Sequence, residues 1–215
     1  MNDDATGLVQ YAATEPRGAL LVLAHGAGAG QRHPFIVHMA QGLAALGIDV
    51  VTFDFPYMHQ RRKVPDKAPV LEACFRDVVA RARLAEGSGG HRLVIGGKSM
   101  GGRMATHLAA QGLDGLAGVV VFGYPLHPPG KPEQIRVSHL PAIRTPVLIV
   151  QGERDTFGTP SEIEGAIQSM TSPVTLHAIP GGDHSLAVRG RDKAAVFDGV
   201  VRTAASWILD VAGFA

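Results

Sequence analysis

Six short runs of apolar, often β-branched residues recur along the chain and alternate with longer stretches of helical periodicity. The runs cover residues 19–24, 49–53, 92–95, 119–122, 147–150 and 174–179. Their apolar character is nearly continuous, which is typical of strands that are buried on both faces. Strands that alternate with helices predict a mainly parallel sheet with helices on both sides, a three-layer α/β/α sandwich. Residues 7–12 predict a short additional edge strand.

Amphipathic or alanine-rich stretches lie between these runs and predict the helices. They cover residues near 35–46, 69–85, 102–111, 161–170 and 193–211. Gly47 and Gly112 follow the first and third stretches, as expected at the C-terminal ends of helices. Ser161 and Glu164 have the spacing of a capping box at the start of the fourth stretch.

The length and composition are those of one globular domain, which we expect to span residues 1–215. The net charge of +1 gives no reason to expect binding to nucleic acid. No apolar run approaches the roughly 18 residues of a membrane span, so no membrane association is expected. The acidic start lacks the apolar segment of a secretory signal, and Cys74 is the only cysteine. We therefore expect a cytoplasmic protein.

Residues 97–101, Gly-Lys-Ser-Met-Gly, join the third apolar run to a helical stretch. A Gly-x-Ser-x-Gly pattern at a strand-to-helix junction is typical of a nucleophile elbow, in which the serine hydroxyl is exposed on a tight turn. The two glycines are needed because a Cβ at either position would collide with the adjoining strand and helix. Ligands bind at the carboxyl ends of parallel strands, where this turn is expected to lie. The pattern makes Ser99 the candidate nucleophile.

A serine nucleophile needs a base, and the base needs an acid that holds its tautomer. Asp155 lies in the turn after the fifth run, and His184 lies in the turn after the sixth, so the order Ser, Asp, His is that of this fold. We predict that Ser99, His184 and Asp155 form a catalytic triad. Asp183 and Glu153 are the alternatives for the acid.

An oxyanion hole requires two preorganised N–H donors. The first is expected to be the backbone N–H of Met100, directly after the nucleophile. The second is expected from the glycine-rich loop after the first run, with Ala27 as the preferred donor and Gly28 as the next. Histidines in this loop or inside predicted elements are expected to be structural: His25, His107 and His177.

Two nucleotide-binding motifs are incomplete in this chain. A phosphate-binding loop that ends at Gly97-Lys-Ser requires a glycine at position 92, which is Arg92. A dinucleotide fingerprint that starts at Gly26 or at Gly28 requires its third glycine at Gln31 or His33. We therefore expect neither a nucleotide nor another cofactor, and no metal.

Further segments extend the likeness to known hydrolases. They are His-Gly-Ala-Gly at 25–28, Phe-Asp-Phe-Pro-Tyr at 53–57, Gly-Lys-Ser-Met-Gly-Gly-Arg at 97–103, Gly-Tyr-Pro-Leu-His at 123–127, Gly-Glu-Arg-Asp at 152–155 and Gly-Asp-His at 182–184. On these segments the chain resembles the α/β-hydrolase superfamily over nearly its whole length. More narrowly, it resembles a small bacterial dienelactone-hydrolase-like family of mostly uncharacterised serine hydrolases. Dienelactone hydrolases carry a cysteine in the elbow, whereas this chain carries Ser99, so the resemblance does not extend to dienelactone chemistry.

The substrate site is expected to be open, because only about 20 residues separate the fourth and fifth runs and these are too few for a cap domain. The cations of segment 57–63 are expected either to be solvated or to guide an anionic substrate. Lys98 would reinforce this guidance, or it would pair with an acid such as Asp54. The predicted substrate-binding residues are Tyr57, Arg61, Arg62, Lys98 and Tyr124.

The expected function is hydrolysis of a small carboxylic ester or thioester through a Ser99 acyl-enzyme. The alternative is a protein-interaction scaffold that keeps the fold but has little turnover, because the resembling family is related to a subunit of a histone-acetyltransferase complex. The sequence does not indicate an oligomeric state.

Overall fold

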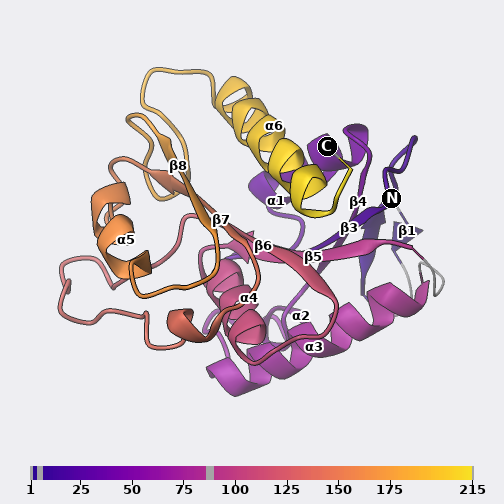
Figure 1. Ribbon diagram of the computed structural model, residues 1–215, viewed down its shortest axis with the longest axis horizontal. Coiled ribbons are helices and arrows are strands. Elements are labelled where there is room, and N and C mark those ends of the chain that lie inside the picture. The colour runs from indigo at the N-terminus through magenta and orange to yellow at the C-terminus, as the bar shows by residue number, and fades with distance from the viewer. Residues whose placement is uncertain (1, 4–6, 86–89, 215) are drawn as a thin grey trace.

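The predicted runs form neighbouring strands of one sheet in the computed structural model, which describes residues 2–3, 7–85 and 90–214 (Figure 1). The strands are β1 (Asn2–Asp3), β2 (Val9–Tyr11), β3 (Ala19–Ala24), β4 (Ile48–Phe53), β5 (Arg92–Lys98), β6 (Leu116–Phe122), β7 (Val147–Gly152) and β8 (Val174–Ile179). Their order across the sheet is β1-β2-β4-β3-β5-β6-β7-β8. Strands β3 to β8 pair in parallel, and β1 and β2 add an antiparallel edge. The predicted parallel sheet and the edge strand near residues 7–12 are confirmed.

Helices cover both faces of this sheet, as predicted for a three-layer sandwich. They are α1 (Pro34–Ala45), α2 (Pro56–His59), α3 (Ala68–Ala85), α4 (Met100–Ala110), α5 (Pro160–Ile167) and α6 (Lys193–Val211). Helices α1 and α6 pack together on one face, and α3 and α4 pack together on the other (Figure 1). The four-residue helix α2 follows β4 directly and was not predicted, because so short a segment carries no periodicity.

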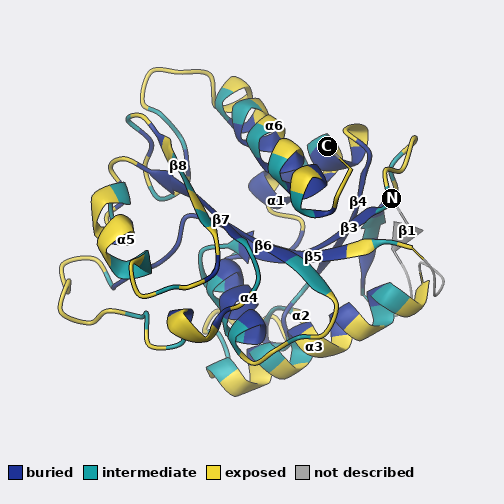
Figure 2. Ribbon diagram, viewed as in Figure 1, coloured by how far each residue is buried: buried dark blue, intermediate teal, exposed yellow. Residues whose placement is uncertain are grey.

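Each face of the sheet has its own hydrophobic core, which explains why the runs are apolar throughout. Leu20 and Val22 of β3 point into the core beneath α3 and α4. Their neighbours Leu21 and Leu23 point into the core beneath α1 and α6. Successive side chains of a strand alternate between faces, so a strand covered on both sides is buried at every position (Figure 2).

The N-terminal cap of α5 differs from the prediction by two residues. Thr159, not Ser161, is the cap, and Glu162, not Glu164, completes the capping box. Pro160 occupies the first helical position, where its fixed φ starts the helix, so Ser161 already lies inside it. The glycines at 47 and 112 do follow α1 and α4.

No cap domain stands over the sheet in the described part of the chain. The connection from β6 to β7 is a loop with one 3-10 turn, Leu140–Ala142. None of the helices that the structure describes is long and apolar enough to cross a membrane. The carboxyl ends of the central strands are therefore reached directly from the loops around them.

Candidate active site

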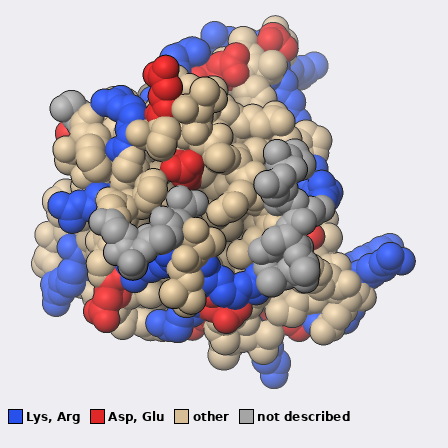
Figure 3. Space-filling view, turned by 90° about the vertical axis from the view of Figure 1, so that its right-hand side faces the viewer, with Lys and Arg blue, Asp and Glu red and all other residues tan. Residues whose placement is uncertain are grey.

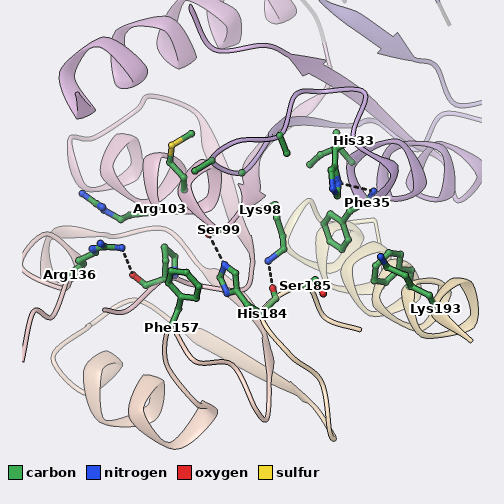
Figure 4. A pocket seen from close by; sticks show the side chains of 17 residues that line it. His33, Phe35, Lys98, Ser99, Arg103, Arg136, Phe157, His184, Ser185 and Lys193 are labelled. Atoms are coloured by element: carbon green, nitrogen blue, oxygen red, sulfur yellow. Dashed lines mark hydrogen bonds between the residues drawn. The ribbon is translucent and has the colours of Figure 1, made fainter. Parts of the chain in front are cut away.

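A cavity of about 500 Å³ lies at the carboxyl ends of the central strands. Its walls come from the loops that follow β3, β5, β6, β7 and β8 and from the first turns of α1, α4 and α6. Ser99 and His184 both line this cavity, together with apolar side chains at its α1 and α6 end (Figure 4). The position agrees with the general rule for ligands of parallel sheets.

Ser99 is the single residue between β5 and α4, so the chain reverses in a very tight turn. Its backbone has φ 50° and ψ −113°, a region that residues with a side chain rarely adopt. A Cβ on Gly97 would lie 2.5 Å from the carbonyl carbon of Gly101 and 2.7 Å from the Ala24 carbonyl oxygen. These approaches are too close for any side chain, which is why the pattern needs glycines. The turn exposes the Ser99 hydroxyl to the cavity.

Two short hydrogen bonds connect Ser99, His184 and Asp155. The Ser99 hydroxyl donates to His184 Nε2 at 2.8 Å. The opposite ring nitrogen, Nδ1, donates to Asp155 Oδ2 at 2.8 Å. Asp155 is 1% exposed, and its other oxygen accepts the backbone N–H of Phe157 at 2.8 Å. The three residues thus have the geometry of a nucleophile, a base and an orienting acid.

The two alternative acids hold loops instead of touching the imidazole. Glu153 Oε2 accepts the backbone N–H of Gly181 at 2.7 Å. Asp183 Oδ1 accepts the N–H groups of Ser185 and Ala187 at 2.8 and 3.1 Å. Both carboxylates therefore brace the turn that carries His184.

The loop after β3 offers one free donor and one that is engaged. Ala27 and Met100 both line the cavity, and within the described chain neither backbone N–H donates a hydrogen bond. The N–H of Gly28 donates to the Tyr57 hydroxyl at 3.3 Å. Of Ala27 and Gly28, Ala27 is therefore the residue whose N–H is available to an oxyanion.

His25 is fully buried beneath this loop. Its Nδ1–H donates to the Gly26 carbonyl at 2.8 Å, and its Nε2 accepts the Phe55 N–H at 3.1 Å. Burial lowers the pKa of His25, which keeps the ring neutral and able to accept that bond. His25 thus braces the loop and does not reach the cavity.

Residues 17–212 match the family model of the alpha/beta hydrolase domain. The chain belongs to the α/β-hydrolase family.

Solved structures of other hydrolases have the same fold. A dienelactone hydrolase from Anabaena variabilis superposes with a TM-score of 0.72 at 20% identity, over 91% of this chain and 88% of the other. A monoacylglycerol lipase from Paleococcus ferrophilus gives a TM-score of 0.73 at 15% identity, over 95% and 98% of the two chains. Est1E from Butyrivibrio proteoclasticus, solved with ferulic acid bound, gives 0.68 at 16% identity, over 98% of each chain. These likenesses confirm the predicted fold.

Four of the five predicted substrate-binding residues of this hydrolase lie away from the cavity. Tyr57 is buried and accepts from Gly28, and Tyr124 is buried and donates its hydroxyl to the Arg136 carbonyl at 2.6 Å. Arg61 and Arg62 are exposed, and Arg62 pairs with Asp66 at 2.7 Å. None of the four is among the residues that line the cavity. The two arginines lie on the loop after β4, which β3 separates from β5 and Ser99.

Lys98 is the predicted residue that does line the cavity. Its ammonium donates to the backbone carbonyl of His184, and it lies 5.9 Å from the centre of the Phe35 ring. Burial lowers the pKa of Lys98 to about 8, although the negative charges of Asp155 and Asp183 act in the opposite direction. The anticipated pairing with Asp54 is not observed. Lys98 instead connects β5, which ends just before Ser99, to the turn that contains His184.

Phe157 and Gln151 complete the surroundings of the imidazole and were not predicted. The Phe157 ring stacks on His184 with centroids 4.1 Å apart and planes 29° apart. The Gln151 amide donates to Asp155 Oδ2 at 2.9 Å and to the Gly158 carbonyl at 2.7 Å. Phe157 lies in the same turn as Asp155, and Gln151 lies near the end of β7, four residues before Asp155, so their closeness in sequence was the available signal. Phe157 thus holds the imidazole ring, and Gln151 holds the carboxylate.

Proposed function

We propose that this α/β-hydrolase cleaves a small carboxylic ester or thioester through a covalent acyl-enzyme on Ser99. The observation that carries the proposal is the pair of 2.8 Å hydrogen bonds from Ser99 to His184 and from His184 to Asp155. A serine hydroxyl is a weak nucleophile unless a base takes its proton as it attacks. In this arrangement the imidazole is within hydrogen-bond reach of that proton, and its tautomer is fixed by the carboxylate.

Acylation begins when Ser99 Oγ attacks the acyl carbon and His184 Nε2 takes the hydroxyl proton. The oxygen of the tetrahedral intermediate accepts hydrogen bonds from the N–H groups of Ala27 and Met100. Losing one such donor typically costs about 2.7–4 kcal/mol of transition-state stabilisation. The imidazolium then gives its proton to the departing alcohol or thiol, which leaves the acyl group on Ser99.

Deacylation repeats these steps with water as the nucleophile. His184 takes a proton from water, the hydroxide adds to the acyl carbon, and the collapsing intermediate returns the proton to Ser99 Oγ. Asp155 stays ionised, keeps Nδ1–H donating to it and stabilises the imidazolium of each step. The products are a carboxylic acid and the regenerated enzyme.

The size and the lining of the cavity support a small substrate. Ligand pockets usually measure about 300–1,000 Å³ and are mainly apolar, with a few polar groups that fix orientation. The cavity of about 500 Å³ presents Phe35, Ile36 and Phe197 at its α1 and α6 end. The names of two structural neighbours, a monoacylglycerol lipase and a ferulic-acid-binding Est1E, are in keeping with ester chemistry on this fold.

Labelling with a fluorophosphonate probe tests the proposal. The probe phosphonylates an activated serine, and mass spectrometry of the digested protein locates it. We expect labelling on Ser99, none in Ser99→Ala, and labelling slowed by orders of magnitude in His184→Ala. Folded protein that resists the probe and hydrolyses no member of an ester and thioester panel would instead support the scaffold alternative.

A further inference from the structure

The Lys and Arg side chains that line the cavity have no acidic residue among them in the part of the chain that the structure describes. Lys98, Arg103, Arg136 and Lys193 line it, and no Asp or Glu is among its lining residues in the described chain (Figure 4). The protein as a whole carries a net charge of only +1, and both signs are interspersed on the face drawn in Figure 3. A cleft that has apolar walls and is lined by cations concentrates anions. The excess of positive charge is therefore a property of the cavity lining and not of the surface in general.

Arg103 lies on the first turn of α4, four residues after the nucleophile, and a relay fixes its side chain. Its Nε–H donates to His107 Nε2 at 3.4 Å, and His107 Nδ1–H donates to Glu72 at 2.7 Å. Burial lowers the pKa of His107, so the ring stays neutral and keeps Nε2 as an acceptor. The relay occupies Nε alone and leaves the two terminal nitrogens of Arg103 without a hydrogen-bond partner in the described chain.

Arg136 reaches the same side of Ser99 from the loop between β6 and β7 (Figure 4). Its N–H donates to the Leu126 carbonyl at 2.8 Å, and its carbonyl accepts the Tyr124 hydroxyl at 2.6 Å. The guanidinium itself makes one long bond, at 3.5 Å, to the Pro125 carbonyl. The backbone of this loop residue is thus held firmly, although the loop has no regular structure.

The two guanidinium groups have no acidic partner. Within the described residues no carboxylate lies within 4.0 Å of either one, so neither forms a salt bridge. Burial, together with the positive charge of Arg136, lowers the pKa of Arg103. The negative charge of Glu72 acts in the opposite direction, but this carboxylate bonds His107 and forms no ion pair with the guanidinium. Two neighbouring guanidinium groups without a direct ion pair repel each other. A bound anion would relieve this repulsion.

We propose that Arg103 and Arg136 form a subsite for an anionic group of the substrate, a carboxylate or a phosphate, beside Ser99. This subsite deepens the proposed ester hydrolysis and rests on it. The planar forks of arginine suit the paired oxygens of both anions. Lys193 is a weaker candidate, because it is exposed and lies over the Phe197 ring at 5.4 Å. The sequence predicted that Arg61 and Arg62 select anionic substrates, whereas the proposed subsite assigns this selection to Arg103 and Arg136.

Matched esters test the subsite. The first series contains 4-nitrophenyl monoesters of dicarboxylic acids, from adipic acid to longer chains. Each is compared with its neutral counterpart, in which the free carboxylate is capped as a methyl ester. A second series carries a terminal phosphate in place of the free carboxylate. We expect a higher kcat/KM for the anionic member of a pair, and the better series identifies the anion. Arg103→Gln and Arg136→Gln should each lower the ratio of anionic to neutral kcat/KM about ten- to hundred-fold, as expected for a charged hydrogen bond.

Two control variants sharpen this comparison. Arg144→Gln removes an exposed arginine that bonds Thr171 and does not line the cavity, and it should leave the ratio unchanged. Arg136→Lys keeps the charge but loses the fork, and it should fall between wild type and Arg136→Gln. Equal kcat/KM for capped and uncapped esters in the wild type, or an unchanged ratio in both glutamine variants, would overturn the subsite.

A binding measurement separates this proposal from the proposed function. Calorimetry measures the affinity of Ser99→Ala for adipate and for a phosphate monoester of the same chain length. The same measurement is made on the double variants that add Arg103→Gln or Arg136→Gln to Ser99→Ala. Binding that the arginine variants weaken supports the subsite even if the enzyme turns over no ester. Fluorophosphonate labelling of Ser99 combined with no anion binding overturns the subsite and leaves the hydrolase proposal standing.

Discussion

Gly101 follows Ser99 by two residues and has no room for a side chain. A Cβ at this position would lie 2.5 Å from the carbonyl oxygen of His25 and 2.7 Å from that of Ala24. Both obstacles are backbone atoms at the end of β3, so no side-chain rotation can relieve the contact. The Gly101→Ala substitution must therefore move either the start of α4 or the start of the loop that contains Ala27.

The size of the effect follows from these distances. Real Cβ contacts do not fall below 3.0 Å, so the backbone must separate by about 0.5 Å or more. Overpacking of this kind costs about 1–3 kcal/mol of unfolding free energy. In a protein of this length each kcal/mol lowers the Tm by about 2–4 °C. Because an error of about 1 Å in a catalytic group costs about a hundredfold in rate, we expect kcat to fall by about ten- to hundred-fold.

Gly165→Ala is the matched control, because the same methyl group enters the exposed side of α5 and meets nothing within 4 Å. Alanine is the better helix former, so this variant should gain about 0.5–1 kcal/mol and keep wild-type kcat. Urea unfolding measures stability, and ester hydrolysis well below the Tm measures activity. Wild-type stability and wild-type kcat in Gly101→Ala would refute the steric account of the elbow.

Three further outcomes are expected. Asp155→Asn should lower kcat by about 10⁴-fold with the fold intact, because the amide no longer holds His184 with Nδ1–H toward the acid; a loss below tenfold in ester turnover would contradict that role. Burial lowers the Lys98 pKa to about 8 from 10.5, so the unfolded chain binds this proton more tightly than the folded protein does. The unfolding free energy should therefore rise between about pH 8 and pH 10.5. Urea titrations across that range should show a smaller rise for Lys98→Met, and equal slopes would show that the lysine is not buried. Thr159→Ala removes the N-cap of α5 and should lower the unfolding free energy by about 1 kcal/mol, whereas an unchanged urea midpoint would mean that the cap is not formed.

The strands and helices could be predicted closely because their signals are local. A strand buried on both faces must be apolar at every position, so the runs mark the sheet almost to the residue. The run at 19–24, for example, coincides with β3, which is buried throughout. The cap of α5 was misplaced because two Thr/Ser-x-x-Glu patterns overlap there, and only the position of Pro160 separates them. Ser99, Asp155 and His184 were found together because each follows a strand, and parallel strands end at one edge.

The substrate-facing residues could not be predicted in the same way, because they depend on which loops are neighbours. Tyr57 and Arg62 follow a strand, as the triad residues do, yet the sheet order β4-β3-β5 keeps their loop one strand away from Ser99. Arg103 reaches the cavity from the first turn of α4, and Arg136 lies in the β6–β7 loop outside any helix or strand. Charge alone did not distinguish these arginines from the other cations of the chain.

The order of the strands also determines how far the turn of His184 must extend to reach Ser99. His184 follows β8 and Ser99 follows β5, so β6 and β7 lie between them and the turn of His184 must extend over their ends. Gly123, the residue after β6, provides the space: a Cβ there would lie 2.7 Å from Lys98 Nζ and 3.5 Å from the His184 ring. The ammonium of Lys98 occupies this space and donates to the His184 carbonyl, which holds the turn over the end of β6. Lys98, the residue before Ser99, thus helps to position His184, and the same long side chain contributes one of the four cations that line the cavity.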